Sequence, residues 1–112
     1  MPVTRRNYFA YKIGQTIHET KLNDIIYLES NKRKLTMHLA NGNTVVFYGK
    51  LKDVYQQQLY NLGFIHIHAS YVVNYNYISK AKYNEVVLVD GTTLPISQLR
   101  RKGTRKAYLL EA

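Results

Sequence analysis

The sequence predicts a mainly β protein with short helices, folded as one domain with antiparallel sheets. Three observations support this: short β-branched and aromatic runs between turn residues, two hairpin signals at Asn41-Gly42 and Asp90-Gly91, and only two helical stretches. Hairpins with few crossover helices favour antiparallel sheets over a doubly wound parallel sheet. The 112 residues, 46% of them hydrophobic, are enough for the core of one compact domain.

The first half of the chain is typical of successive strands. Gly14-Gln15 and Asn41-Gly42 each read as the turn of a hairpin between two strands. The run Asp24–Glu29 is rich in β-branched and aromatic residues, which is typical of a central strand. We therefore expect strands at 8–13, 16–20, 24–29, 34–39 and 44–48.

Another hairpin is expected towards the C-terminal end. Residues 85–89 lead through Asp90-Gly91 to residues 92–96, and both runs have the composition of strands. Pro95 lacks a backbone N–H, so it predicts a sheet edge or the end of a strand at that position.

Two segments show helical spacing. Residues 50–62 repeat apolar side chains at steps of three and four, and Gly63 is a fitting stop. Ser97 is expected to cap a second, basic helix that runs to about Leu110, with Gly103 weakening its middle. The apolar positions expected to face the core are Leu51, Val54, Tyr55, Leu59 and Leu62 in the first helix and Leu99, Ala107 and Leu110 in the second.

The composition excludes several classes of protein. The chain has no cysteine, which rules out a disulfide scaffold, a Cys-ligated zinc finger and thiol catalysis. The longest apolar runs are about four residues, as in 86–89, too short to cross a membrane. The N-terminal residues MPVTRRN are not followed by the apolar core of a signal peptide. We expect a cytoplasmic protein.

Charge provides the first indication of function. Sixteen Lys and Arg against seven Asp and Glu give a net charge of +9, which suits a polyanionic partner. The cations form two clusters, one in the turn Asn31–Lys34 and one at residues 100–106. Either cluster alone could be a solvated surface, but two clusters with few acids nearby favour DNA or RNA.

No catalytic or cofactor motif is complete. Gly49-Lys50 is similar to the end of a phosphate-binding P-loop, but Thr44 stands at the position of its first glycine. Leu51 replaces the Ser or Thr that would hold magnesium. Ser70 lies near His68 in the sequence but has no acidic partner and no flanking elbow glycines. The sequence therefore predicts no enzyme and no cofactor.

A metal site is also not indicated. His66 and His68 would lie on one face of a strand, but no third ligand is close to them in the sequence. His18 and His38 could approach them only through folding. We expect no metal ion.

The 11 tyrosines leave a second class of nucleic acid open. Tyrosine rings stack on single-stranded bases, so an RNA-binding module that combines them with the basic patches is an alternative. Strand tyrosines more often fill sheet faces, and Tyr27, Tyr48 and Tyr71 all lie within apolar runs. A basic interaction module without any nucleic-acid role is a third alternative.

Residues 64–74, FIHIHASYVVN, resemble a motif of LytTR-type DNA-binding domains, which occur in bacterial response regulators and other transcription regulators. The resemblance extends to the surrounding order of elements: a strand like 24–30, a hairpin, a helix like 51–62, and later a glycine hairpin. Leu94–Ser97 matches the closing Leu-Pro-Ile-Ser, which precedes a basic helix. The match covers nearly everything from about Tyr8 onward.

This resemblance implies one elongated domain over residues 1–112, a stack of small antiparallel sheets with a basic C-terminal helix and a flexible segment at 1–7. Its partner would be double-stranded DNA, with a second copy of the domain on repeated half-sites. Family members usually carry a receiver domain or a membrane sensor ahead of this module, and 112 residues leave no room for either.

The resemblance also implies how DNA would be bound, with loops from one edge entering successive major grooves. Base-reading positions of the family map to Arg33, to Ala69 and to the segment 98–100. Gln98, Arg33 and Arg100 would read bases, whereas the other residues would hold phosphates or orient the loops. The DNA-binding residues implied are Lys32, Arg33, Lys34, His68, Ala69, Ser70, Ser97, Gln98, Arg100, Arg101 and Lys102.

Two positions depart from the family pattern. Ala69 stands where the family usually has Arg or Asn, and Leu99 is not a base-reading side chain. Sequence preference should therefore differ from that of better-matched members. An alternative is that Ala69 is small because it is buried.

Overall fold

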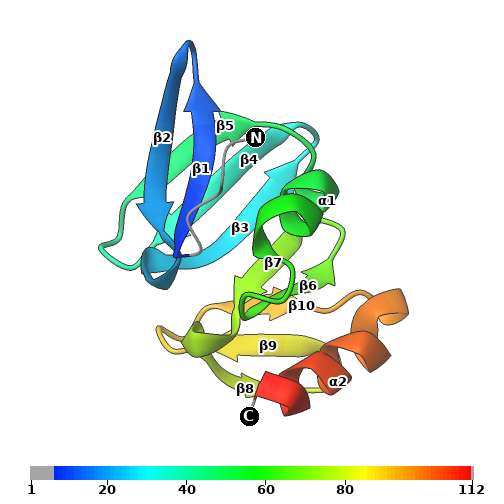
Figure 1. Cartoon of the computed structure of the whole chain (residues 1–112). Coiled ribbons are helices and arrows are strands. Elements are labelled where there is room, and N and C mark those ends of the chain that lie inside the picture. Colours follow the sequence, from blue (N-terminus) through cyan, green and yellow to red (C-terminus); the bar gives the residue numbers. More distant parts are fainter. Residues whose placement is uncertain (1–6, 112) are drawn as a thin grey trace.

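The computed structural model describes residues 7–111, which form three antiparallel sheets. In Figure 1 the sheets are stacked, with the β1–β2 hairpin at one end, a five-stranded sheet in the middle and the sheet of β8, β9 and β10 at the other end. The body measures 41 × 26 × 25 Å. The predicted mainly β, elongated stack with short helices is therefore confirmed.

The first sheet is the hairpin of β1 (Tyr8–Ile13) and β2 (Thr16–Lys21), and Gly14 takes a φ of +61° in its turn. The short 3-10 helix η1 (Leu22–Asp24) follows. Of the segment 1–7 predicted to be flexible, only Asn7 lies within the described residues. Its carbonyl accepts a hydrogen bond of 2.9 Å from the backbone N–H of Leu22.

The central sheet has the strand order β5-β4-β3-β7-β6. Its strands are β3 (Ile25–Asn31), β4 (Lys34–Leu39), β5 (Thr44–Tyr48), β6 (Phe64–His68) and β7 (Tyr71–Asn74). The strand predicted at 24–29 begins one residue later and is the middle strand, as its composition indicated. Those predicted at 34–39 and 44–48 have the expected bounds.

The third sheet has the order β10-β9-β8. It contains β8 (Ile78–Ala81), β9 (Glu85–Leu88) and β10 (Thr93–Pro95), and the 3-10 helix η3 (Tyr75–Tyr77) leads into it. Pro95 lies on β10, an edge strand of this sheet, where the missing N–H does not interrupt hydrogen bonding between inner strands. The predicted edge position is therefore confirmed.

Two hydrophobic cores lie on opposite faces of the central sheet, because side chains alternate along each strand. Leu28 and Val72 join the core shared with β1, α1 and η2, whereas Val73 and the half-buried Tyr27 join the core shared with the third sheet. The largest fully buried side chains are Phe9, Ile25, Leu28, Leu35, Met37, Leu59, Ile67, Leu88, Val72, Val73 and Val86.

The first predicted helix is shorter than expected. It consists of α1 (Leu51–Val54) and a π-helical turn, η2 (Tyr55–Leu59), and it ends at Leu59. Leu51 and Leu59 are buried, but Leu62 lies beyond the end and is 38% exposed, so its predicted place on the helix was wrong.

The second predicted helix begins with the 3-10 turn η4 (Gln98–Arg100) and continues as α2 (Arg101–Glu111). The Ser97 side chain makes no capping hydrogen bond. Leu99 and Leu110 are exposed, because α2 instead packs Thr104, Ala107 and Tyr108 inwards. No helix within residues 7–111 is long and apolar enough to cross a membrane.

Candidate nucleic-acid interface

The first candidate segment is the turn between β3 and β4. Asn31 pairs with Lys34, so Lys32 and Arg33 form the tip, and Lys32 has a positive φ of 60°. The Ser30 hydroxyl donates 2.8 Å to the Lys32 carbonyl. The Gly49 N–H donates 2.9 Å to the Arg33 carbonyl. These bonds hold the backbone of a tip whose two cationic side chains are exposed.

The second segment is the turn between β6 and β7, residues 68–70. Ala69 at its tip is exposed, so the alternative in which it is small because it is buried is wrong. The Ser70 N–H donates 3.0 Å to Nδ1 of His68, which therefore acts as an acceptor and leaves the ring proton on Nε2. The His68 ring packs against Tyr71, with centroids 5.5 Å apart. His68 thus orients the turn.

The third segment is residues 97–102. The Ser97 N–H donates 3.0 Å to the Ile67 carbonyl on β6, and the Arg100 N–H donates 2.9 Å to the Ser97 carbonyl. Gln98 and Lys102 are exposed, whereas Arg100 is half-buried. The guanidinium of Arg101 lies over the ring of Tyr83, 4.9 Å from its centroid.

These three recognition segments, 31–34, 68–70 and 97–102, lie side by side although they are far apart in the sequence. The Ser30 N–H donates 2.8 Å to the Ser70 carbonyl, which joins the first segment to the second. The bond from Ser97 to β6 places the third beside the second. The structure therefore places next to one another the three segments that contain the residues named for DNA binding.

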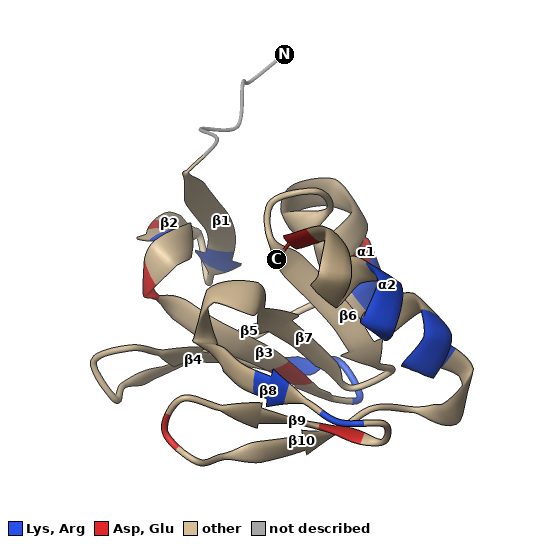
Figure 2. Ribbon diagram, turned by 90° about the horizontal axis from the view of Figure 1, so that it is seen from below, with Lys and Arg blue, Asp and Glu red and all other residues tan. Residues whose placement is uncertain are grey.

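The cations of these segments have no carboxylate partner within residues 7–111. The ion pairs there are Lys82 with Glu85 at 3.6 Å and the contact of His38 Nε2 with Glu29 Oε1 at 2.6 Å. Figure 2 shows the blue Lys and Arg positions along α2 and on β8. The arrangement leaves the charge of the segments available to a polyanion.

His66 and His68 have different surroundings. A bulge shifts the register between His66 and His68, so the prediction that they share a face was wrong: His66 packs against Tyr55 and His68 against Tyr71. No group of three potential ligands is close together among the described residues.

Burial and the nearby Arg100 charge lower the pKa of His66 from 6.5 to about 4. Because the pKa is lower in the folded state than in the unfolded state, the folded domain has its full stability with respect to His66 above pH 6.5. This contribution to the free energy of unfolding is lost as the pH falls towards 4. We expect thermal unfolding to show this loss, and His66→Phe to remove most of it. A His18→Phe control at an exposed ring should keep it. An unchanged pH profile in His66→Phe would contradict the assignment.

Some residues that shape the interface were missed in the sequence. Ser30 and Gly49 hold the first tip, and Tyr83 holds Arg101. Of these residues, only Ser30 could have been identified from the sequence, because a serine hydroxyl commonly donates a hydrogen bond to a backbone carbonyl of the turn that follows it. Among the tyrosines, Tyr27 is half-buried as expected of a strand residue, but Tyr48 is 75% exposed.

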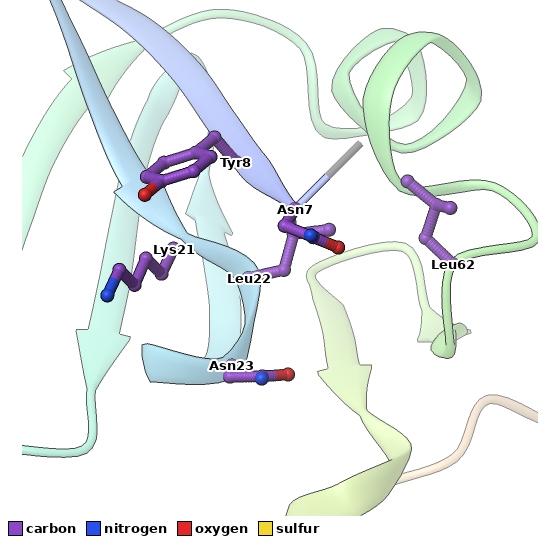
Figure 3. A pocket seen from close by; sticks show the side chains of 6 residues that line it. All are labelled: Asn7, Tyr8, Lys21, Leu22, Asn23 and Leu62. Atoms are coloured by element: carbon purple, nitrogen blue, oxygen red, sulfur yellow. The ribbon is translucent and has the colours of Figure 1, made fainter. Parts of the chain in front are cut away.

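One hollow shares no lining residue with the recognition segments. It has a volume of about 420 Å³ and is shown in Figure 3. Its lining is Asn7, Tyr8, Lys21, Leu22, Asn23 and Leu62. Lys21 is the one charged side chain in this lining.

Comparison with known proteins agrees with this geometry. The chain has 21% identity and a TM-score of 0.73 with a solved structure described as the LytTr DNA-binding domain of a methyl-accepting/DNA response regulator from Bacillus cereus. The alignment covers 90% of this chain and 95% of that one. No curated protein sequence matches. The sequence model of the LytTr DNA-binding domain matches residues 15–108. The chain therefore belongs to this non-catalytic family, whose domains bind DNA in transcription regulation.

Proposed function

We propose that this domain recognises a specific sequence of duplex DNA by placing loops from the edge formed by the three recognition segments in successive major grooves, with the intervening minor groove facing the protein. The observation that carries the proposal is the pair of backbone hydrogen bonds, Ser30 to Ser70 and Ser97 to Ile67, that sets the segments side by side. An edge of this kind, with cations in its two outer segments, can follow one face of a duplex, with the tips reaching base edges.

Each side chain has a role that follows from its position. Arg33 at the exposed tip and Arg100 in the third segment reach guanine, because a guanidinium pairs with both O6 and N7. Gln98 is exposed and pairs with adenine. The remaining contacts fix the register on phosphate and come from Lys32, Lys34, Ser70, Ser97, Arg101 and Lys102. His68 shapes the turn, and its Nε2–H is a further donor.

Selection of bound sites from random duplex DNA tests the proposal. One preferred sequence should be enriched, and unlabelled single-stranded RNA should compete poorly for the complex. The enriched DNA sites also show whether the preferred sequence occurs once or twice, because a second copy of the domain would bind a repeated half-site. An RNA preference would favour the tyrosine-stacking alternative, and the absence of any enriched sequence would contradict specific recognition.

Binding should depend steeply on salt. About six phosphate contacts per protomer give a plot of log K against log salt with a slope on the order of −5, because each contact releases counterions. The measurement is a titration of the selected duplex at several salt concentrations. A flat response would show that the cations of the recognition segments do not contact phosphate.

Ala69→Arg should add a base contact in the middle of the site. The exposed tip has room for a long side chain, and the new cation lies between the outer segments, so affinity should rise. Repeated site selection should show a new guanine preference midway between the two outer contacts. Thermal melting checks that the variant is folded. A folded variant without a new central preference would mean that Ala69 does not face DNA.

A further inference from the structure

A second recess lies next to the third recognition segment. Helix α2 packs against strand β6, and Tyr55 of η2 lies beside His66 of that strand, with ring centroids 5.2 Å apart. Two adjoining hollows of about 260 and 230 Å³ lie here, and both are lined by Tyr55, Ile65, Gly103 and Ala107. The larger one also contacts Arg100. A recess of this size with an apolar floor suits a small organic molecule.

Two buried polar atoms in this recess have no hydrogen-bond partner. They are Nε2 of His66 and the hydroxyl oxygen of Thr104, and both residues line the larger hollow. Thr104 is only 2% exposed. A buried polar group without a partner costs free energy, and native proteins leave few of them. Both atoms are thus available to a polar group inside the hollow.

The charges around the recess favour an anion. Arg100 lies close enough to His66 to lower the pKa of its ring, and Lys106 lines the adjoining hollow. Glu111, at the far end of α2, is the only acid in the lining of either hollow. The Thr104 hydroxyl can donate to a carboxylate and Arg100 can pair with it, whereas Nε2 of His66 can donate once the ring is protonated.

We propose that this recess binds a small amphipathic carboxylate, with its carboxylate at His66, Thr104 and Arg100 and its apolar body along Ile65 and Ala107. Because Arg100 belongs to the third recognition segment, a bound carboxylate would compete with DNA for that cation. This consequence rests on the proposed DNA contact of Arg100, but binding to the free domain does not.

The first experiment uses the free domain with benzoate and naphthoate as probes and benzamide as the neutral control. In an NMR titration, each carboxylate should shift the His66 and Thr104 signals at low millimolar concentration or below, and benzamide should not. A carboxylate within reach of His66 should also raise the pKa of its ring, measured by the same method. The titratable or charged groups near that ring are Tyr55 from η2, Arg100 from η4 and His68 from β6.

Thr104→Val isolates the site. Removing a hydroxyl that has no partner should leave the fold intact or raise its melting temperature. Benzoate affinity should fall by at least about tenfold, because a hydrogen bond to a charged group is lost. Thr93→Val, at an exposed threonine on β10, should leave it unchanged. In a second experiment, benzoate should weaken binding to duplex DNA in the unaltered domain but not in Thr104→Val.

The outcomes separate the two proposals. Benzoate shifts at His66 that vanish in Thr104→Val support the recess whether or not the domain selects a DNA sequence. Equal binding of benzamide, unchanged benzoate affinity in folded Thr104→Val, or shifts spread evenly over the surface lysines would overturn the site. Loss of sequence-specific DNA binding alone would contradict only the proposed function.

Discussion

Arg33→Ala and Arg100→Ala should each weaken binding to the selected duplex by about 1–3 kcal/mol and relax the base preference at one position. Arg33 has the more exposed side chain and lies at a tip whose backbone is held by Ser30 and Gly49, so its guanidinium is well placed to enter a groove. Competition binding on the selected site and on variants with one base changed measures both effects.

Matched variants separate base reading from charge. Arg33→Lys keeps the positive charge but loses the two-pronged guanidinium, so the salt slope should persist while the guanine preference declines. Lys102→Ala should weaken all sequences alike and make the slope shallower by about 1. Arg33 and Lys102 are exposed, so the melting temperatures of their variants should change little. If site selection with Arg33→Ala returns the unaltered profile, Arg33 is not a base reader.

Asn74→Ala should destabilise the domain by about 3 kcal/mol. This side chain is 3% exposed, and its amide donates to the carbonyls of Leu22 at 3.3 Å and Ile25 at 2.9 Å. Its Oδ1 accepts from the Asn76 N–H at 3.0 Å. The alanine variant leaves these buried groups without partners, in addition to losing contacts between η1, β3 and β7.

Chemical denaturation with a linear extrapolation measures this loss. Asn76→Ala is the control, because its side chain is exposed and its backbone N–H survives the substitution. The free energy of unfolding of the control should lie within about 0.5 kcal/mol of that of the unaltered domain. An Asn74→Ala variant as stable as the control would show that the amide does not join these elements.

Hairpins were predicted well, because their signals are local. The turn at Asn41-Gly42 needs a positive φ, which Gly42 supplies at +89°, and the flanking strands at 34–39 and 44–48 have the predicted bounds. The basic turn after β3 was also placed correctly. In each case the relevant contacts lie within a few residues of one another.

The buried faces of the helices were predicted less well. The spacing of apolar residues indicates that a helix has an apolar side, but it does not show which side packs against the rest of the domain. In α2 the face that packs on the rest of the domain contains Thr104, Ala107 and Tyr108, and Leu99 and Leu110 stay in solvent. A polar residue such as Thr104 on the packed face is not expected from composition. The same limit applies to His66 and His68, since a bulge between them is invisible in an alternating pattern.

Contacts between distant residues were not predictable from the residues themselves. The side chain of Gln58 bonds to both the N–H and the carbonyl of Ala10, at 2.9 and 2.7 Å, and so ties η2 to β1. Asn74 stood out only as part of a motif, without a role. The hydrogen bonds of Gln58 and Asn74 depend on which distant segments the fold brings next to them, and no local sequence pattern gives that information.

By itself the sequence determined the β class, the limits of most strands, the two clusters of cations and the resemblance that led to the family. Local sterics, turn chemistry and charge content are properties of short segments, so they can be read there. Only the tertiary structure decided that the three recognition segments lie side by side and that His66 and Thr104 line one recess. Those facts depend on backbone pairing between β3, β7 and β6 and on the docking of α2, which are set by packing across the whole domain.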